Sequence, residues 1–221
     1  MEADVLIIGG GAAGMVAALL LAKAGKHCII LEKNGQIGRK LRITGKGRCN
    51  LTNACDLDTL MANVPRNPKF LYSAFARWMP EDVMAYFEQL GVPLKVERGN
   101  RVFPVSDRAE DIVAALQRAL KRAGVPVYRE TVQQLLLQEG RCTGVQTASG
   151  KQYAAKYVLL AAGGASYPAT GSTGDGYRFA QEAGHSVVQP IPSLVGIELA
   201  EDVCAAQGIS LKNAVLPARR N

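Results

Sequence analysis

Three glycines near the N-terminus have the spacing of a phosphate-binding turn. Gly9, Gly11 and Gly14 follow a β-branched apolar run at residues 4–8 and open an Ala- and Leu-rich stretch. In the G-x-G-x-x-G pattern the first glycine makes a tight turn, the second lets the backbone approach a pyrophosphate, and the third allows close helix–strand packing. The free N–H groups at the start of the following helix also favour an anion. The spacing therefore predicts a site for a phosphate-containing ligand.

An acidic residue completes the pattern. Glu32 ends a second apolar run, HCIILE, 18 positions after Gly14. A carboxylate there can accept hydrogen bonds from both hydroxyls of an unphosphorylated ribose. Strands at 4–8 and 27–31, a helix at 12–24 and the terminal acid together predict a dinucleotide-binding βαβ unit. This unit alone does not distinguish NAD from FAD.

The remaining pattern places this unit in a larger α/β fold. A long loop rich in glycine and basic residues is expected at 33–55. Asp107 is expected to cap a strongly amphipathic helix that Gly124 ends. The further elements that we expect are helices at 68–77, 80–90, 107–123 and 174–183, short strands at 94–97 and 101–104, and extended runs at 126–129, 131–138, 143–148 and 152–160.

The last extended run indicates which cofactor the fold accepts. It reads KYVLLAAGG and has the continuous apolar character of a fully buried strand. We interpret it as the third strand of a parallel sheet, reached through a three-stranded antiparallel insertion. That crossover is typical of FAD-binding domains of the two-dinucleotide type and uncommon in plain NAD dehydrogenases. The predicted fold class is thus α/β, a Rossmann-like FAD-binding domain with a parallel sheet and an antiparallel crossover, followed by the start of an inserted β-rich domain; a plain NAD-binding Rossmann protein is the less favoured alternative.

Composition narrows the class of protein. The 221 residues are 48% hydrophobic, enough for a substantial core, and carry a net charge of +7 at pH 7. The basic residues form no single run and no interleaved aromatics are apparent, so an anionic cofactor is favoured over nucleic acid, with RNA binding as the alternative. Neither a signal peptide nor a membrane span is expected, which predicts a cytoplasmic protein. The two main basic clusters are Arg39, Lys40, Arg42, Lys46 and Arg48, and Arg118, Lys121 and Arg122.

The five cysteines are scattered and include no CxxC pair. This predicts neither a metal site nor a dithiol redox motif, and it excludes the flavin disulfide reductases. Cys49 has Lys46 and Arg48 nearby to lower its pKa, but no histidine follows in the loop to act as a base. A packed thiol beside the cofactor is therefore favoured over a nucleophile.

One loop carries a more specific resemblance. GRKLRITGKGRCNLTN, from Gly38 to Asn53, resembles the hallmark loop of the bacterial aminoacetone-oxidase-like, BaiN-type family of NAD(P)/FAD-dependent oxidoreductases. Residues 100–113 and 163–177 are similar to two further signatures of that family. The resemblance implies FAD-dependent chemistry, and the assignments within such families include amine oxidation and reduction of conjugated enones.

The resemblance also implies a domain organisation. Residues 1–190 are expected to form an FAD-binding Rossmann-like domain, and residues 191–221 the beginning of an inserted β-rich substrate domain. Members of the family run substantially further and return to the flavin. We therefore expect this chain to be a fragment or a truncated product.

Together these features predict an FAD-dependent oxidoreductase. Hydride would pass between the flavin and a small organic substrate, with NAD(P)H as the electron donor. The alternative is a non-catalytic or truncated module that binds flavin or RNA. The sequence identifies no catalytic residue, since His185 and Tyr167 lack any partner that marks them as acid or base, and it does not determine the oligomeric state.

Several residues have an expected place along the cofactor. Arg39 and Lys40 are expected beside the adenosine ribose and phosphates, with a solvated basic loop as the alternative, and Val132 beside the adenine. Asp175 is expected either to hold the ribityl chain or to cap the helix that it begins. The full predicted set is Gly9, Gly11, Ala12, Ala13, Gly14, Glu32, Lys33, Gly38, Arg39, Lys40, Thr44, Gly45, Arg48, Cys49, Asn50, Val132, Ala162, Gly163, Gly164 and Asp175.

Overall fold

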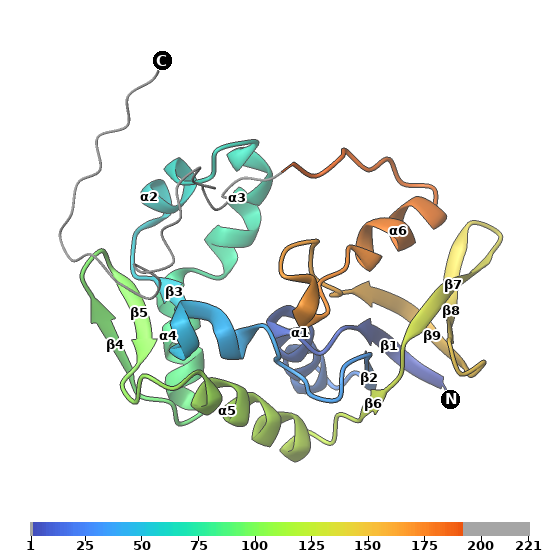
Figure 1. Cartoon of the computed structure of the whole chain (residues 1–221), viewed down its shortest axis with the longest axis horizontal. Helices are drawn as coiled ribbons and strands as arrows, with labels where there is room; N and C mark the ends of the chain where they lie inside the picture. Colours follow the sequence, from blue (N-terminus) through green and yellow to red (C-terminus); the bar gives the residue numbers. More distant parts are fainter. Residues whose placement is uncertain (1, 192–221) are drawn as a thin grey trace, which may run out of the picture. The chain divides into compact units, whose positions relative to one another are not determined.

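The computed structural model describes residues 2–191 (Figure 1). The chain divides into two units, residues 1–187 and 188–221, and every element described below belongs to the first. The inserted domain expected at 191–221 lies, apart from its first residue, outside the described residues. The elements are β1 (Glu2–Ile8), α1 (Ala12–Lys23), β2 (Cys28–Glu32), the 3-10 segment η1 (Leu41–Gly47), β3 (Thr52–Asn53), α2 (Leu57–Ala62), α3 (Pro68–Arg77), α4 (Pro80–Gln89), β4 (Leu94–Glu97), β5 (Arg101–Pro104), α5 (Ala109–Arg122), β6 (Val127–Arg129), β7 (Val132–Gln138), β8 (Arg141–Thr147), β9 (Gln152–Leu160), η2 (Pro168–Thr170) and α6 (Asp175–Glu182).

A six-stranded sheet with the order β6-β2-β1-β9-β8-β7 forms the centre of the first unit (Figure 1). Strands β6, β2, β1 and β9 are parallel, whereas β7 and β8 add to β9 in antiparallel fashion. The predicted α/β fold class is confirmed. One detail differs, because β6 extends the parallel part beside β2, so the antiparallel crossover consists of β7, β8 and the first residues of β9.

Both faces of β1 and β2 are covered, which explains why these two strands read as continuous apolar runs. The expectation of a fully buried strand at the end of β9 is wrong, because Tyr157, Leu159 and Leu160 are 69%, 37% and 38% exposed. In β1, Val5 and Ile7 pack in one apolar cluster, whereas Leu6 and Ile8 pack in another. The first cluster includes residues of α1 and α5, and the second includes Phe179 of α6. The helices α1 and α5 therefore lie on one face of the sheet and α6 on the other.

A smaller antiparallel sheet, β3-β5-β4, contacts helix α4 through β3 and β4. The short helix α2 was not expected from the sequence; it begins where the Asp56 carboxylate accepts a hydrogen bond from the Thr59 backbone amide at 2.8 Å. The predicted cap of α5 is wrong. Arg108 takes the cap position, and Asp107 has φ = +55° and directs its carboxylate to Arg48 and Lys95 instead.

Candidate cofactor-binding site

A cavity of about 490 Å³ lies where the carboxyl ends of β1, β2 and β9 meet. One part of its wall is formed by the turn between β1 and α1 and by the residues that follow β2. The other part is formed by the start of β7 and by residues of the segment from Leu160, the last residue of β9, to Asp175. The carboxyl ends of parallel strands are where open α/β sheets bind ligands. Its size is in the range of pockets that hold cofactors.

The three glycines of the first turn have distinct roles. A Cβ on Gly14 would lie 1.9 Å from the Gly9 carbonyl oxygen, and a Cβ on Gly9 would lie 2.4 Å from the Ala161 carbonyl oxygen. These two glycines therefore allow the close packing of helix α1 and strand β9 on the turn. A Cβ on Gly11 would meet nothing within 4 Å, and Gly11 lines the cavity. Gly11 leaves open space for a ligand beside the first turn of α1, which no side chain caps.

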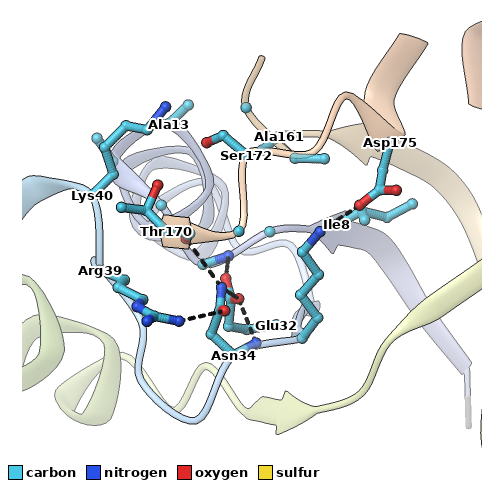
Figure 2. A pocket seen from close by; sticks show the side chains of 18 of the residues that line it. Ile8, Ala13, Glu32, Asn34, Arg39, Lys40, Ala161, Thr170, Ser172 and Asp175 are labelled. Atoms are coloured by element: carbon cyan, nitrogen blue, oxygen red, sulfur yellow. Dashed lines mark hydrogen bonds and ion pairs between the residues drawn. The ribbon is translucent and has the colours of Figure 1, made fainter. Parts of the chain in front are cut away.

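Glu32 is a buried carboxylate held by three donors (Figure 2). Its Oε2 accepts a hydrogen bond from the Gly10 backbone amide at 2.7 Å. Its Oε1 accepts from the backbone amide and the side-chain amide of Asn34, at 2.8 and 2.6 Å. Each carboxylate oxygen can accept more than one hydrogen bond, so a ribose hydroxyl can still bind at Oε2.

Asn34 links Glu32 to the opposite wall of the cavity, as Figure 2 shows. Its side-chain amide also lies 3.4 Å from the Thr170 carbonyl oxygen, and Arg39 donates to its carbonyl oxygen at 3.3 Å. A Cβ on Gly171 would lie 2.5 Å from Asn34 Nδ2, so this approach requires a glycine. Asn34 was missed in the sequence, since nothing in its local pattern distinguishes it from a loop asparagine.

Two lysines join the residues after β2 to the segment after β9. Lys33 Nζ lies 2.6 Å from Asp175 Oδ2 and 2.6 Å from the Thr173 hydroxyl, and Lys40 Nζ donates to the Ser166 carbonyl at 2.8 Å. Burial raises the pKa of Asp175, but the hydrogen bonds from Lys33 and Thr173 outweigh it and hold that pKa below its usual value. Asp175 is the first residue of α6 and Gly174 is its cap, so the capping alternative for Asp175 is wrong.

The structure brings most of the predicted cofactor residues together around the cavity. It also adds residues that sequence reasoning missed, chiefly Gly10, Asn34, Glu130 and the Thr170–Ser172 segment. Those of the predicted set that line the cavity are Gly9, Gly11, Ala12, Ala13, Glu32, Lys33, Gly38, Arg39, Lys40, Thr44, Val132, Ala162, Gly163 and Asp175. Those that do not line it are Gly14, Gly45, Arg48, Cys49, Asn50 and Gly164.

Arg48 lies in an ion-pair network. Its Nη2 is 2.6 Å from Glu97 and its Nε is 2.9 Å from Asp107, while its guanidinium lies 3.9 Å from the centre of the Phe103 ring. Lys95 joins the same two carboxylates. These contacts attach the end of the η1 segment to β4, β5 and the start of α5.

Cys49 is a packed thiol. Its side chain is 1% exposed and belongs to the apolar cluster that includes Phe87 and Ile112. Burial raises the pKa of the Cys49 thiol above its usual value, which opposes formation of a nucleophilic thiolate. Gly45, in the same segment, has φ = +57°, and a Cβ there would lie 2.8 Å from the Asn50 backbone nitrogen.

Other site classes find no support in the part of the chain that the structure describes. No group of three or more His, Cys, Asp or Glu side chains could hold a metal ion among these residues. His27 and His185 do not line the cavity. None of the helices within residues 2–191 combines the length and the apolar character needed to cross a bilayer.

Curated relatives match along nearly the whole chain. It is 33% identical over 196 residues to the 3-dehydro-bile acid delta(4,6)-reductase of Clostridium scindens, covering 87% of this chain and 47% of the relative. It is 32% identical over 213 residues to the ribosomal RNA dihydrouridine synthase of Haemophilus influenzae, covering 93% of this chain and 52% of the relative. The chain thus spans about half the length of the curated relatives that it matches.

Solved structures share the fold. A flavocytochrome c3 fumarate reductase in its open conformation matches with a TM-score of 0.60 at 22% identity, over 82% of this chain and 40% of that one. The 3-ketosteroid-delta4-(5alpha)-dehydrogenase of Rhodococcus jostii RHA1 matches with a TM-score of 0.59 at 20% identity, over 73% of this chain and 46% of that one. Residues 3–215 match the family described as HI0933-like protein Rossmann domain. This match, together with the glycine turn after β1 and the carboxylate of Glu32 at the end of β2, shows that the chain belongs to the HI0933-like Rossmann domain family.

Proposed function

We propose that this chain is the FAD-binding part of an FAD-dependent oxidoreductase. The observation that carries the proposal is the pairing of Gly11, which leaves open space at the cavity, with Glu32, a buried acceptor at the end of β2. The turn from Gly9 to Ala13 would hold the pyrophosphate, Glu32 the adenosine ribose, and the backbone at Val132 the adenine. When bound, FAD supplies hydride transfer, and the chain supplies binding and orientation.

The relatives' names support a particular reaction class for the whole protein. A delta(4,6)-reductase acting on a 3-dehydro-bile acid saturates a carbon–carbon double bond conjugated to a ketone. A dihydrouridine synthase saturates the C5–C6 bond of uracil, which is conjugated to the C4 carbonyl. In such a reduction the hydride would add to a carbon activated by conjugation with the carbonyl, the β carbon of an enone or the δ carbon of a dienone, and a proton would add to the neighbouring carbon nearer the carbonyl. We propose reduction of such a conjugated double bond, with NAD(P)H as the hydride source.

Two substrate classes fit this reaction. A small enone is the first, and it agrees with the BaiN-type grouping that we propose on the loop from Gly38 to Asn53. A uridine in RNA is the second, supported by the names of the relatives from Haemophilus influenzae and Escherichia coli, 32% and 26% identical, and by the net charge of +7. The second class would replace the sequence-based expectation of a small molecule.

Cofactor binding is tested on the purified chain. We expect an oxidised-flavin absorption band after reconstitution with FAD. We expect the Gly11→Val variant to retain no flavin and to melt at the temperature of the flavin-free wild type, since bound FAD itself stabilises the fold. A wild-type protein without flavin after reconstitution would overturn the proposal. NAD(P)H consumption in the presence of a 3-keto steroid enone or of a uridine-containing RNA then separates the substrate classes, with dihydrouridine measured by mass spectrometry.

A further inference from the structure

We propose that the outward face of α3 is a binding surface for single-stranded RNA, separate from the cofactor cavity. We call this surface the α3 outer face and define it by Arg66, Lys69, Phe70, Tyr72 and Arg77. None of these residues lines the cavity. The inference rests on the proposed function in the form in which the substrate is a uridine in RNA. It adds the place on the molecule where that RNA binds.

The exposure of two aromatic side chains is the first observation. Helix α3 contains no buried residue. Phe70 is 85% exposed and Tyr72 is 54% exposed. Exposed apolar rings that gather on one surface and are bordered by polar residues mark an interaction site, whereas a single exposed ring does not.

The inward face of the same helix shows that this exposure is not a lack of packing. Leu71, Phe75 and Trp78 are all partly buried. Trp78, just after the helix, contacts the edge of Tyr86 of α4 with ring centres 5.7 Å apart. The helix is thus attached to the domain by one side, and Phe70 and Tyr72 are not needed for that attachment.

The arrangement of positive charge is the second observation. Arg77 lies seven positions after Phe70, and Lys69 lies three positions before Tyr72, so each basic side chain shares a helix face with an exposed ring. Arg66 precedes the helix and lines a shallow depression together with Lys69 and Phe70. None of the three basic residues forms an ion pair with another described residue.

The charge of this segment favours a polyanion over a protein partner. Residues 59–80 contain these three basic residues and neither aspartate nor glutamate. Unpaired cations beside exposed rings are the combination by which proteins hold single-stranded nucleic acid, since bases stack on the rings and phosphates contact the cations. Exposed rings beside basic residues were not expected, because the pattern at 68–77 indicated only a helix.

The test compares two double variants that remove the same charge. Lys69→Gln with Arg77→Gln acts on the α3 outer face, and Lys121→Gln with Arg122→Gln acts on exposed positions near the end of α5. Binding of a short uridine-rich single-stranded RNA to the FAD-loaded chain is measured across a salt series. We expect the α3 variant to bind about tenfold more weakly and its log K against log salt slope to fall by about 1.4, or about 0.7 per lost phosphate contact. The α5 control should bind like the wild type.

A ring variant tests stacking independently of charge. Phe70→Ala should weaken RNA binding by about tenfold while leaving the salt slope unchanged. Arg66→Gln changes the charge without altering a residue of α3, and it should weaken RNA binding and lower the salt slope by about 0.7. Flavin content and melting temperature, measured for every variant, should match the wild type.

Three outcomes would overturn the inference. Equal weakening in the α3 and α5 variants would show attraction to net charge alone. Preferential binding to mixed phosphatidylcholine and phosphatidylserine vesicles, lost in the α3 variant, would show a membrane surface instead. If the flavin-loaded wild-type protein binds no RNA, the proposed RNA surface is wrong, but the proposed FAD-dependent activity is not affected. If the protein binds no flavin, the proposed FAD-dependent activity itself is wrong.

Discussion

The Glu32 carboxylate accepts a hydrogen bond from the Gly10 backbone amide at 2.7 Å, so the acid at the end of β2 orients the glycine turn that follows β1. The same carboxylate is held from its other oxygen by Asn34. One side chain therefore connects the two loops that would hold the ribose and the pyrophosphate. Its removal should affect the turn as well as the ligand.

Glu32→Gln should weaken both FAD binding and the fold. The substituted amide places a donor against either Gly10 N–H or the Asn34 amides, and leaving a buried donor unpaired costs about 1–3 kcal/mol. We expect a loss of this size in the free energy of FAD binding, measured by calorimetry, together with a lower melting temperature. Glu88→Gln, at an exposed position of α4, is the control and should change neither. An unaltered FAD affinity in Glu32→Gln would remove Glu32 from the site.

Substitutions at two glycines of the turn should have opposite consequences. Gly14→Ala places a methyl group 1.9 Å from the Gly9 carbonyl oxygen, so helix α1 must shift, and we expect a loss of about 3 kcal/mol in stability. Gly11→Val meets no protein atom within 4 Å of its Cβ, so the fold should persist while FAD is lost. Denaturant titration and flavin content of the two proteins distinguish these effects. A Gly11→Val protein that keeps stoichiometric FAD would show that the phosphates lie elsewhere.

Cys49 should be chemically inert in the native protein. Burial raises the pKa of its thiol, and the side chain is 1% exposed, so iodoacetamide at neutral pH should modify the partly exposed Cys55 and Cys142 first. Peptide mass spectrometry measures the modification rates. Cys49→Ala should retain its FAD and lose about 1 kcal/mol of stability. Loss of turnover without loss of folding in this variant would instead indicate a chemical role.

The Arg48 network should make the fold sensitive to acid. The hydrogen bond from Arg48 holds the pKa of Glu97 below its usual value, and the hydrogen bond from Lys95 does the same for Asp107. Because the folded-state pKa values are lowered, this stabilisation is present above about pH 4.5 and is lost as the pH falls through them. Arg48→Met should therefore melt below the wild type at neutral pH, and the difference should shrink below about pH 4. A difference that stays constant with pH would mean that packing on Phe103, not charge, dominates.

Local patterns predicted the parts of the fold that local chemistry determines. The βαβ unit was recognised because the glycine turn and Glu32 each have a local physical role, and both lie within the first 32 residues. The helix α5 was recognised from its periodicity, but its cap was not, because Asp107 pairs with Lys95, 12 positions away, and with Arg48, 59 positions away.

Long-range contacts explain what the sequence did not reveal about the site. Thr170 lies 136 positions from Asn34, and Asp175 lies 142 positions from Lys33, yet each pair is in contact across the cavity. No periodicity or spacing rule links such distant residues. Arg48 shows the converse, since its place in a glycine-rich basic loop indicated phosphate contact, whereas Glu97 and Asp107 draw it toward β4 and α5.

The position of strand β9 late in the sequence affects how the sheet forms during translation. Residues of β9 pair with β1 in the register Ile8↔Leu160, so β1 acquires one of its two neighbours only after about 150 further residues have been translated. At about 5–20 residues per second, this interval is roughly 8–30 s. During that time β1 can pair only with β2. The backbone N–H and C=O groups along its other edge stay unpaired, and because the strand is rich in Val, Leu and Ile, another chain could pair there. The dinucleotide turn is complete in sequence early, but Gly9 packs against Ala161, so its final geometry must await the end of β9.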